Sequence, residues 1–437
     1  MLNVLKNKRF RHLFLAQIVA LLGTGLATVA LGLLAYDIAG GQASLVLGGV
    51  FTIKMIAYVG IAPIAGAFAD RVDRRKLLVG LDLIRAFVAL ALPFTTDVWQ
   101  IFGLIFLLQA ASAGFTPTFQ ATIPDVLPEE QDYTRALSLS RLAYDLESLI
   151  TPTLAAILLT VFAYNALFLG TLVGFLGSAL LIISIALPNP KPSAPRGIYD
   201  RTTRGIRIYL ATPRLQGLLA LCMTVAAVAA VVLVNTVVLV RSELGLNNSH
   251  VAYALGAFGG GSMIAAFALP KVLDHTTDRL VMISGSVLMV FALIGLALNG
   301  VTWTALLATW FFIGLGYSIT LTPSGRLLQR SAHPEDRPAV YAAQFALSHA
   351  CWLIAYPLSG WAQTTLGSTQ TMIILAAIGA VSSIAAMRLW PTGQQREFLH
   401  THDDLPADHP HLKGSDGNAH SHAYVIDEYH AFWPKKS

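Results

Sequence analysis

The stretch that decides the fold is Gly66-Ala-Phe-Ala-Asp70-Arg71-Val-Asp73-Arg74-Arg75-Lys76, which separates two long apolar segments. A glycine at the end of the first segment lets a neighbouring helix approach closely. Asp70 follows at the edge of the apolar run, where a carboxylate needs a cation or a helix N-terminus as its partner. The basic cluster after it cannot cross a bilayer cheaply, so it holds this loop on the cytoplasmic side.

Composition places the rest of the chain in a membrane. Hydrophobic residues make up 55% of the 437 and charged residues 12%, whereas a soluble domain carries about 25% charged residues. A helix needs about 20 apolar residues to cross the hydrocarbon core, and barrel strands would be about 10 residues of alternating polarity. The apolar runs therefore predict twelve transmembrane helices, at residues 13–35, 45–69, 77–94, 99–121, 142–163, 165–187, 214–240, 251–273, 280–298, 301–324, 339–362 and 369–389.

The positive charges fall on one face of the membrane when the N-terminus is placed inside. Of the 29 lysines and arginines, 26 lie in inner loops, the tail or the inner ends of spans, Arg241 alone lies in an outer loop, and Lys54 and Arg85 lie deep within predicted spans. This distribution is the one that the positive-inside bias predicts. We expect a multi-pass protein of the plasma (inner) membrane with both termini in the cytoplasm. Cytoplasmic loops account for the net charge of +5, so no nucleic-acid partner is expected.

An internal repeat divides the chain into two halves. Thr116-Pro117-Thr118 matches Thr322-Pro323-Ser324, and Pro128-Glu129-Glu130 matches Pro334-Glu335-Asp336 at the same offset of 206 residues. A proline-rich break separates the sixth predicted span from the seventh. We therefore predict an all-α membrane protein with two pseudo-symmetric six-helix bundles, at residues 1–187 and 214–390. A cytoplasmic linker at 188–213 joins them, and a histidine-rich cytoplasmic tail follows at 391–437.

The basic loop, the twelve spans and the repeat together resemble the major facilitator superfamily of secondary transporters. The signature of that superfamily is G-x-x-x-D-R-x-G-R-R/K, and Asp73 stands where the signature usually has Gly. The resemblance implies two bundles around a central cavity and transport by alternating access. It also implies contact between Asp70 and the N-terminal end of the eleventh span. The conformational switch that it implies consists of Gly66, Asp70, Arg71, Arg74 and Arg75.

Two further features resemble the drug and siderophore efflux branch of that superfamily, which includes macrolide, enterobactin and nickel exporters. One is Arg9-Phe10-Arg11 together with the basic loop. The other is the stretch around Pro152, which resembles a Gly-Pro-rich exporter motif with its glycines replaced by Thr and Ala, and whose proline would kink the helix. A basic residue that many proton-coupled exporters carry in the fourth span has no counterpart before Gln109.

Ionisable side chains within the spans are candidates for substrate binding and coupling, because a charge at membrane depth costs at least about 2.5–3.5 kcal/mol. Lys54 and Glu147 would form a proton or cation site, or an ion pair that controls gating. His349 titrates in a useful pH range, although a lone histidine is often only a hydrogen-bonded interior residue. Asp82 and Arg85, one turn apart, are interpreted as a structural ion pair. The full set of transport and coupling candidates is Lys54, Asp145, Glu147, His349, Gln109 and Asn235.

The tail carries three H-x-H pairs, which are His400/His402, His409/His411 and His420/His422. Imidazoles with nearby carboxylates suit transition-metal cations. We expect a Ni, Co or Zn ion at these six histidines and no cofactor that the protein requires. The alternative is a solvated tail whose histidines have no task. A more apolar stretch at 425–434 is expected to dock on the cytoplasmic face.

These features predict a secondary active transporter, namely a proton- or ion-coupled exporter that works by alternating access. Its substrate would be a transition-metal cation such as nickel or a small organic compound. The alternative is a non-transporting membrane sensor of metals on a transporter scaffold. The expected partners are the lipid bilayer, the substrate and protons, and the protein is expected to be a monomer. No nucleophile–base pair or phosphate loop is present in the sequence, so an enzyme is not expected.

Overall fold

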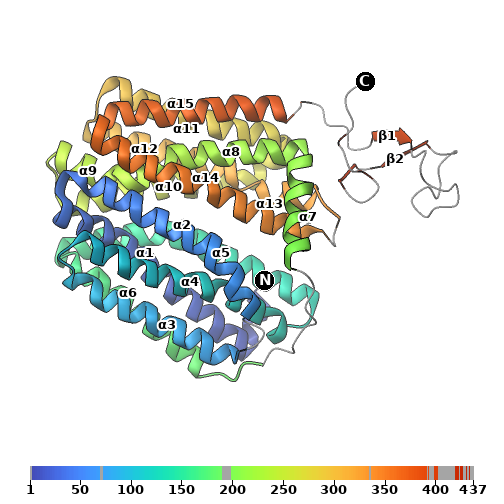
Figure 1. The fold of residues 1–437 in the computed structure, drawn as a ribbon, viewed down its shortest axis with the longest axis horizontal. Helices are drawn as coiled ribbons and strands as arrows, with labels where there is room; N and C mark the ends of the chain where they lie inside the picture. Colours follow the sequence, from blue (N-terminus) through green and yellow to red (C-terminus); the bar gives the residue numbers. More distant parts are fainter. Residues whose placement is uncertain are drawn as a thin grey trace.

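The computed structural model describes residues 2–68, 72–188, 198–333, 336–390, 392, 398–401, 419–422, 424–426, 430 and 433, some of them by their backbone alone. Twelve long helical segments run through these residues (Figure 1). The first six are α1 (Lys8–Ala39), α2 (Ala43–Phe68), α3 (Arg74–Ala91), α4 (Val98–Val126), α5 (Glu130–Val161) and α6 (Asn165–Ile183). The last six are α8 (Pro213–Ala230) with its continuation, α10 (Asn248–His275), α11 (Asp278–Asn299), α12 (Trp303–Leu321), α14 (Arg337–Leu366) and α15 (Ser368–Leu389).

The remaining elements are short. The segment that begins with α8 continues through π-helical η4 (Val231–Asn235), α9 (Thr236–Val238) and π-helical η5 (Leu239–Glu243). The other short helices are η1 (Leu2–Lys6), η2 (Gly40–Gln42), η3 (Leu92–Phe94), α7 (Ile198–Ala211) and α13 (Ser324–Gln329). In the tail, β1 (Phe398–Thr401) pairs antiparallel with β2 (Ala419–His422). The linker predicted at 188–213 thus contains a helix, α7.

The predicted spans agree with the long helices, and the largest difference lies at α5. The fifth span was expected to begin at 142, whereas α5 begins at Glu130. Its first turns carry charged and polar residues, which a search for apolar runs excludes. Nine stretches of the described residues are long and apolar enough to cross a membrane, and the first, Lys8–Ile61, holds α1 and most of α2. The two long helices outside these nine are α5 and α14.

Local sequence sets the helix ends. Asn7 caps α1 by accepting hydrogen bonds from Arg9 N at 3.0 Å and Phe10 N at 3.2 Å, and Asp73 caps α3 by accepting one from Lys76 N at 2.9 Å. Such side chains satisfy the free N–H groups of a first helical turn. Gly300, with φ of 81°, ends α11, and a left-handed conformation of this kind favours glycine.

Helix contacts repeat between the halves. In the first half α1 packs on α5 and α6, α2 on α4, and α3 on α4 and α6. In the second half α8 packs on α14 and α15, α10 on α12, and α11 on α12 and α15. The contacts between the halves also form an equivalent pair, which is α2 with α14 and α5 with α10. This pattern is that of two copies of one unit related by a pseudo-two-fold axis.

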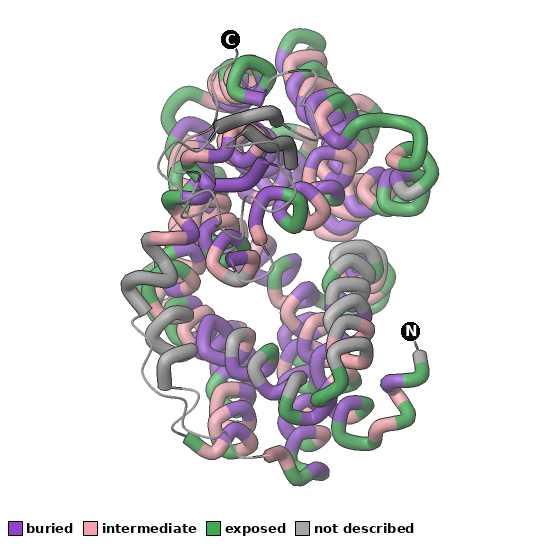
Figure 2. Tube along the Cα trace, turned by 90° about the vertical axis from the view of Figure 1, so that its right-hand side faces the viewer, coloured by how far each residue is buried: buried purple, intermediate pink, exposed green. Residues whose placement is uncertain are grey.

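Buried residues lie within each group of helices (Figure 2). Large apolar side chains nevertheless cover the outer surface, including Phe267 at 74% exposure and Phe291 at 68%. Apolar surface on this scale suits contact with lipid tails rather than water. The helix ends fall on two faces. We call the face that carries the α2–α3 and α10–α11 connections, α7 and the chain after α15 the basic end, and the other face the opposite end.

Candidate functional site

Three helices from both halves bring Lys54, Tyr58, Glu147 and His349 together, and we call these four residues the interface cluster. The Tyr58 ring of α2 stacks on the His349 ring of α14, with centroids 5.9 Å apart and an interplanar angle of 12°. Lys54 Nζ lies 6.0 Å from the centroid of the Tyr58 ring. The Lys54 charge interacts with the Glu147 carboxylate of α5 and with the His349 imidazole. Three of the predicted candidates therefore lie in one place.

Helical spacing of four residues explains how each helix presents its part of the cluster. Lys54 and Tyr58 stand four residues apart on α2 and so share one face. On α14 the same spacing places Phe345 beside His349, with ring centroids 3.9 Å apart and His349 Nδ1 2.6 Å from the Phe345 carbonyl oxygen. A Cβ atom added to Gly25 of α1 would clash with the Glu147 carboxylate. Gly25 therefore provides the space that Glu147 occupies.

Polar atoms without partners lie beside the cluster. The Thr116 hydroxyl lies beside the phenols of Tyr58 and Tyr144, and Gln17 lies beside Tyr144. Gln17 Oε1 is buried and has no hydrogen-bond partner among the described residues. The Thr151 hydroxyl is next to Glu147 but makes no hydrogen bond of good geometry within the part of the chain that the structure describes. Buried polar atoms are normally satisfied, so these are positions where a substrate or water could bind.

Asp82 and Arg85 form the ion pair expected of them. The Arg85 guanidinium contacts Asp82 within α3, and Ser178 Oγ of α6 donates a hydrogen bond of 2.7 Å to Asp82 Oδ2. The guanidinium also lies over the rings of Phe115, at 4.0 Å, and Phe175, at 4.6 Å. Both charges are enclosed within the first half, although Arg85 Nε has no hydrogen-bond partner among the described residues. The pair joins α3 to α6, and the Arg85 charge also acts on the Tyr58 phenol of the interface cluster.

The other candidates are not brought to the cluster by any contact among the described residues. Gln109 is half-buried on α4. Asn235 lies at the end of η4, donates a hydrogen bond of 3.0 Å to Ser359 Oγ of α14, and keeps Oδ1 buried without a described partner. It thus joins two helices of the second half. Only the backbone is described for Asp145 and Pro152, which both lie within α5, so their side-chain roles stay predictions.

At the basic end of the first half, the start of α3 holds the ends of two other helices. Arg74 forms an ion pair with Asp125 at the end of α4. Arg75 donates a hydrogen bond to the Ile183 carbonyl at the end of α6. Gly66 lies within α2, whereas Asp70 and Arg71 lie outside the described residues. The expected contact between Asp70 and the eleventh span therefore stays a prediction.

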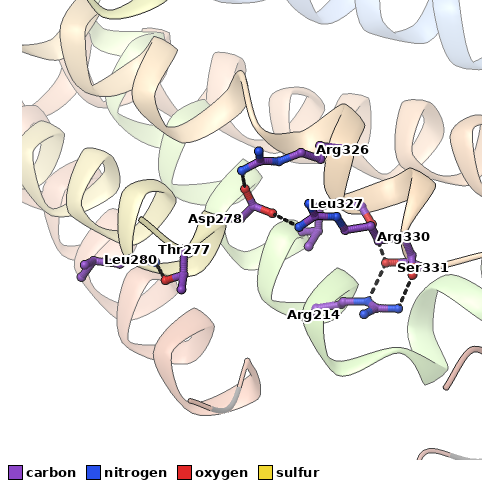
Figure 3. Close-up of polar contacts among 8 residues, drawn as sticks. All are labelled: Arg214, Thr277, Asp278, Leu280, Arg326, Leu327, Arg330 and Ser331. Carbon is purple, nitrogen blue, oxygen red and sulfur yellow. Dashed lines mark hydrogen bonds and ion pairs between the residues drawn. The ribbon is translucent and has the colours of Figure 1, made fainter. Parts of the chain in front are cut away.

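The second half repeats this geometry with the charges of the ion pair exchanged (Figure 3). Asp278 begins α11 and contacts Arg326 and, at 3.1 Å, Arg330 of the α13 segment. Arg279 donates hydrogen bonds of 2.5 Å to the Trp390 carbonyl and 2.9 Å to the Met387 carbonyl at the end of α15. Asp278 thus takes the place of Arg74 at the start of its helix. Its partners Arg326 and Arg330 take the place of Asp125. This pair is not evident from the sequence, because matching residue types between the halves does not reveal an ion pair whose charges are exchanged.

Arg214 extends this basic-end cluster toward the tail. Its guanidinium donates hydrogen bonds of 2.7 Å to Ser331 Oγ and 2.6 Å to the Arg330 carbonyl oxygen (Figure 3). It also lies 5.5 Å from the centroid of the Trp433 ring. Tyr424 and Ile426 are buried against the same core as the C-terminal helices. The described residues of the 425–434 segment thus lie against the helices near the basic end, whereas the assignment of this end to the cytoplasmic face stays a prediction.

Metal binding by the tail stays a prediction. His402, His409 and His411 lie outside the described residues, and only the backbone is described for His400, His420 and His422. Among the side chains that the structure describes, no group of three His, Cys, Asp or Glu residues could hold a metal ion. The interface cluster in particular combines one carboxylate and one imidazole with a lysine.

At the opposite end the two halves touch closely. Ser242 Oγ donates a hydrogen bond of 3.1 Å to Tyr36 Oη, and the Arg241 guanidinium lies 5.1 Å from the centroid of the Tyr36 ring. The single basic residue expected in an outer loop is therefore a contact between the halves. Helices α2 and α14 cross at Gly48 and Gly360, where a Cβ added to Gly360 would lie 2.5 Å from the Ser44 carbonyl oxygen.

Comparison with known proteins identifies the family of this chain. The family model of the Major Facilitator Superfamily matches residues 13–298 and 218–407. The MFS-type transporter YvqJ of Bacillus subtilis is 25% identical over 395 residues, which cover 87% of this chain and 91% of that protein. Macrolide efflux protein A of Streptococcus pyogenes is 28% identical over 149 residues, 33% of this chain and 36% of that protein. Multidrug resistance protein MdtG of Proteus mirabilis is 27% identical over 172 residues, 38% of this chain and 41% of that protein.

Solved structures show the same fold. A bacterial homologue of the human lysosomal transporter Spinster, in an inward-facing and unoccupied conformation, matches with a TM-score of 0.71 at 12% identity, over 88% of this chain and 98% of that one. The nucleoside transporter NupG matches with a TM-score of 0.67 at 13% identity, over 87% and 98%. The chain belongs to the Major Facilitator Superfamily and is an integral, multi-pass membrane transport protein, with twelve long helical segments in the part of the chain that the structure describes.

Proposed function

We propose that this transporter is a proton-coupled exporter of a small organic compound, and that the interface cluster couples proton binding to alternating access. The observation that carries the proposal is the position of the cluster. Lys54 and Glu147 of the first half meet His349 of the second half, at a place where the helices α2 and α14 join the halves. A change of charge there acts on both halves at once.

The electrostatics of the cluster supply the coupling. With Glu147 ionised, its carboxylate compensates the Lys54 charge, which would otherwise be costly at membrane depth. A proton on Glu147 removes that compensation, so Lys54 must find another partner or another environment. A ligand or proton shifts a two-state equilibrium only through its different free energy in the two states. Because Lys54 also contacts Tyr58 and acts on His349, the cluster meets this requirement across the interface.

An organic substrate is favoured over a metal cation. Lys54 occupies the neighbourhood of the carboxylate that a cation would need. Aromatic surface stands beside the cluster, since Phe345 is 43% exposed and Tyr144 is 38% exposed. Apolar and aromatic surfaces with a few polar groups are typical of sites for organic molecules. The names of two relatives, a macrolide efflux protein and a multidrug resistance protein, support the same class.

Sidedness and direction complete the proposal. The basic end faces the cytoplasm of a cell whose inner membrane holds the protein, because the positive-inside bias governs short loops. The close contacts at the opposite end would then close the outer side, which supports a conformation that admits substrate from the cytoplasm. Substrate would enter there and leave outward, as expected of an exporter. The protein acts as a monomer, since each chain carries both halves of the cluster.

Tolerance assays in cells test the substrate class. Cells that express the protein should survive higher concentrations of amphiphilic antibiotics, macrolides among them, than cells with the Glu147→Gln variant. Their tolerance of Ni²⁺ and Co²⁺ should be unchanged. Metal tolerance without drug tolerance would overturn the organic substrate. Neither phenotype, together with a transcriptional response to metals, would favour a membrane sensor instead.

A further inference from the structure

We propose that the ends of α11 and α15 at the basic end form a binding site for the phosphate headgroup of an anionic phospholipid, held by Arg279 and Arg388. Both helices are long and apolar enough to cross the membrane, and they pack side by side in the second half (Figure 1). Arg279 is the second residue of α11, and Arg388 is the last but one of α15. Both arginines therefore stand where a span meets the headgroups of the bilayer. The site is separate from the interface cluster and does not depend on the substrate that the transporter carries.

Arg279 is fixed at the end of α15 by hydrogen bonds that leave part of its guanidinium free. Its Nε donates to the Trp390 carbonyl oxygen, and its Nη2 donates to the carbonyl oxygen of Met387, the neighbour of Arg388 in the chain. Its Nη1 has no bond to any residue that the structure describes, and the side chain is only partly buried. The two arginines thus meet at one helix end, with donors of a preoriented guanidinium left for a ligand.

Arg388 is a charge that the scaffold does not need. It is exposed and makes no hydrogen bond or ion pair with any described residue. In the first half Arg75 holds the end of α6 through the Ile183 carbonyl, as Arg279 holds the end of α15 through that of Met387. The residue after Ile183 is Ser184, which bonds only to its own helix. One arginine is therefore enough to hold such a helix end, and the second half adds another.

Exposed apolar side chains lead away from the two arginines and define the ligand as amphiphilic. Val381, Ile384 and Arg388 follow one face of α15 at helical spacing, and Val381 and Ile384 are both exposed. Leu280, beside Arg279 on α11, is also exposed and lies away from the Asp278 ion pair (Figure 3). A guanidinium matches the geometry of a phosphate, and basic residues between transmembrane helices suit acidic lipid headgroups. The ligand is therefore a diacyl phospholipid with a net negative headgroup.

Native mass spectrometry of the full-length protein in detergent, titrated with phosphatidylglycerol or phosphatidylcholine, tests the site. The wild type should bind phosphatidylglycerol more tightly than phosphatidylcholine, and Arg388→Gln should weaken the former by about fivefold, the effect of one basic residue near an anionic lipid. Because Arg388 has no described partner, this variant should fold as the wild type does. Arg11→Gln is the matched control, since it removes an exposed arginine near the start of α1. No loss in Arg388→Gln, or an equal loss in Arg11→Gln, would overturn the proposal.

Two further measurements separate a lipid from free phosphate and locate it. Neither inorganic phosphate nor the soluble headgroup glycerophosphoglycerol, each in large excess, should displace bound phosphatidylglycerol, because neither contacts the apolar side chains. Displacement by either would show a phosphate site without a lipid and would overturn the proposal. In nanodiscs, phosphatidylglycerol with a photoreactive headgroup should crosslink to peptides that contain the ends of α11 and α15. Crosslinks spread evenly over the basic ends of all the helices would refute a defined site.

Discussion

Replacing Gly360 by alanine should open the opposite end of the transporter. Helices α2 and α14 cross there in backbone contact. A Cβ atom at Gly360 would lie 2.5 Å from the Ser44 carbonyl oxygen and 3.2 Å from Gly48 Cα. Carbon atoms pack at about 3.5–4.0 Å, and backbone atoms cannot rotate away as a side chain could. The two helices would have to separate by about 1 Å to accept the methyl group.

The cost of that overlap falls on one conformation only. Overpacking of a close contact costs about 1–3 kcal/mol, which lowers the population of the closed arrangement by about 5- to 150-fold. The alternative conformation of a two-state protein is commonly populated at about 0.1–10%. The variant should therefore convert a minor open form into a substantial or dominant one. Alanine also favours the helix by about 1 kcal/mol over glycine, but it does so in both conformations.

Spin labels measure the change directly. Labels at Thr96→Cys and Asn299→Cys sit on exposed turns of the two halves at the opposite end. Pulsed electron–electron distance measurements on reconstituted protein should show a longer distance in Gly360→Ala. Gly60→Ala is the matched control, because Gly60 lies on α2 and a Cβ there meets nothing within 4 Å. Identical distance distributions for the Gly360 and Gly60 variants would refute the reasoning.

Three further substitutions test the energetics of the helices by thermal unfolding of the purified protein in detergent. Asp82→Asn leaves the buried Arg85 charge unpaired and should destabilise the protein by about 3–5 kcal/mol; an unchanged midpoint would contradict the enclosed pair. Asp278→Asn should cost about 1 kcal/mol or less, because its partners Arg326 and Arg330 are 36% and 57% exposed, and a loss as large as that of Asp82→Asn would be inconsistent with this. Thr236→Val removes the acceptor of the 2.7 Å hydrogen bond from Trp310 Nε1 and should cost about 0.6–1.7 kcal/mol, whereas the control Thr365→Val, whose hydroxyl bonds only within its own helix at 2.8 Å, should cost less.

The helices could be predicted from sequence because the length of an apolar run and the position of positive charges are direct consequences of the bilayer. The proximity of Lys54, Glu147 and His349 was harder to predict from the sequence. Each could be singled out as a polar residue within a span, but their convergence depends on which helices touch across the two halves. Tyr58 was missed, since tyrosine within a span is unremarkable by composition. Its spacing of four residues from Lys54 was the available signal.

Two other features of the structure could not be predicted from residue types alone. The repeat aligns Pro117 with Pro323, yet α4 continues through its proline, whereas α12 ends at Leu321 and α13 begins at Ser324. The same Thr-Pro motif is thus found in two backbone conformations. The ion pair of Asp278 fulfils the role of the Arg74 pair with opposite charges. An ion pair is equally attractive whichever helix carries the acid. The two halves can therefore hold equivalent ion pairs whose residue types do not match in an alignment.

The proton-coupling role of Glu147 is tested most directly by transport in proteoliposomes with an imposed pH gradient. Wild-type protein should accumulate an antibiotic identified by the tolerance assay when the gradient is present. Glu147→Gln should lose this gradient-driven accumulation while it keeps exchange of labelled for unlabelled substrate, because a neutral amide cannot take up or release the proton. Asp97→Asn, at an exposed turn, should behave as the wild type. Gradient-driven accumulation by Glu147→Gln at the wild-type level would contradict the role assigned to this carboxylate and to the interface cluster.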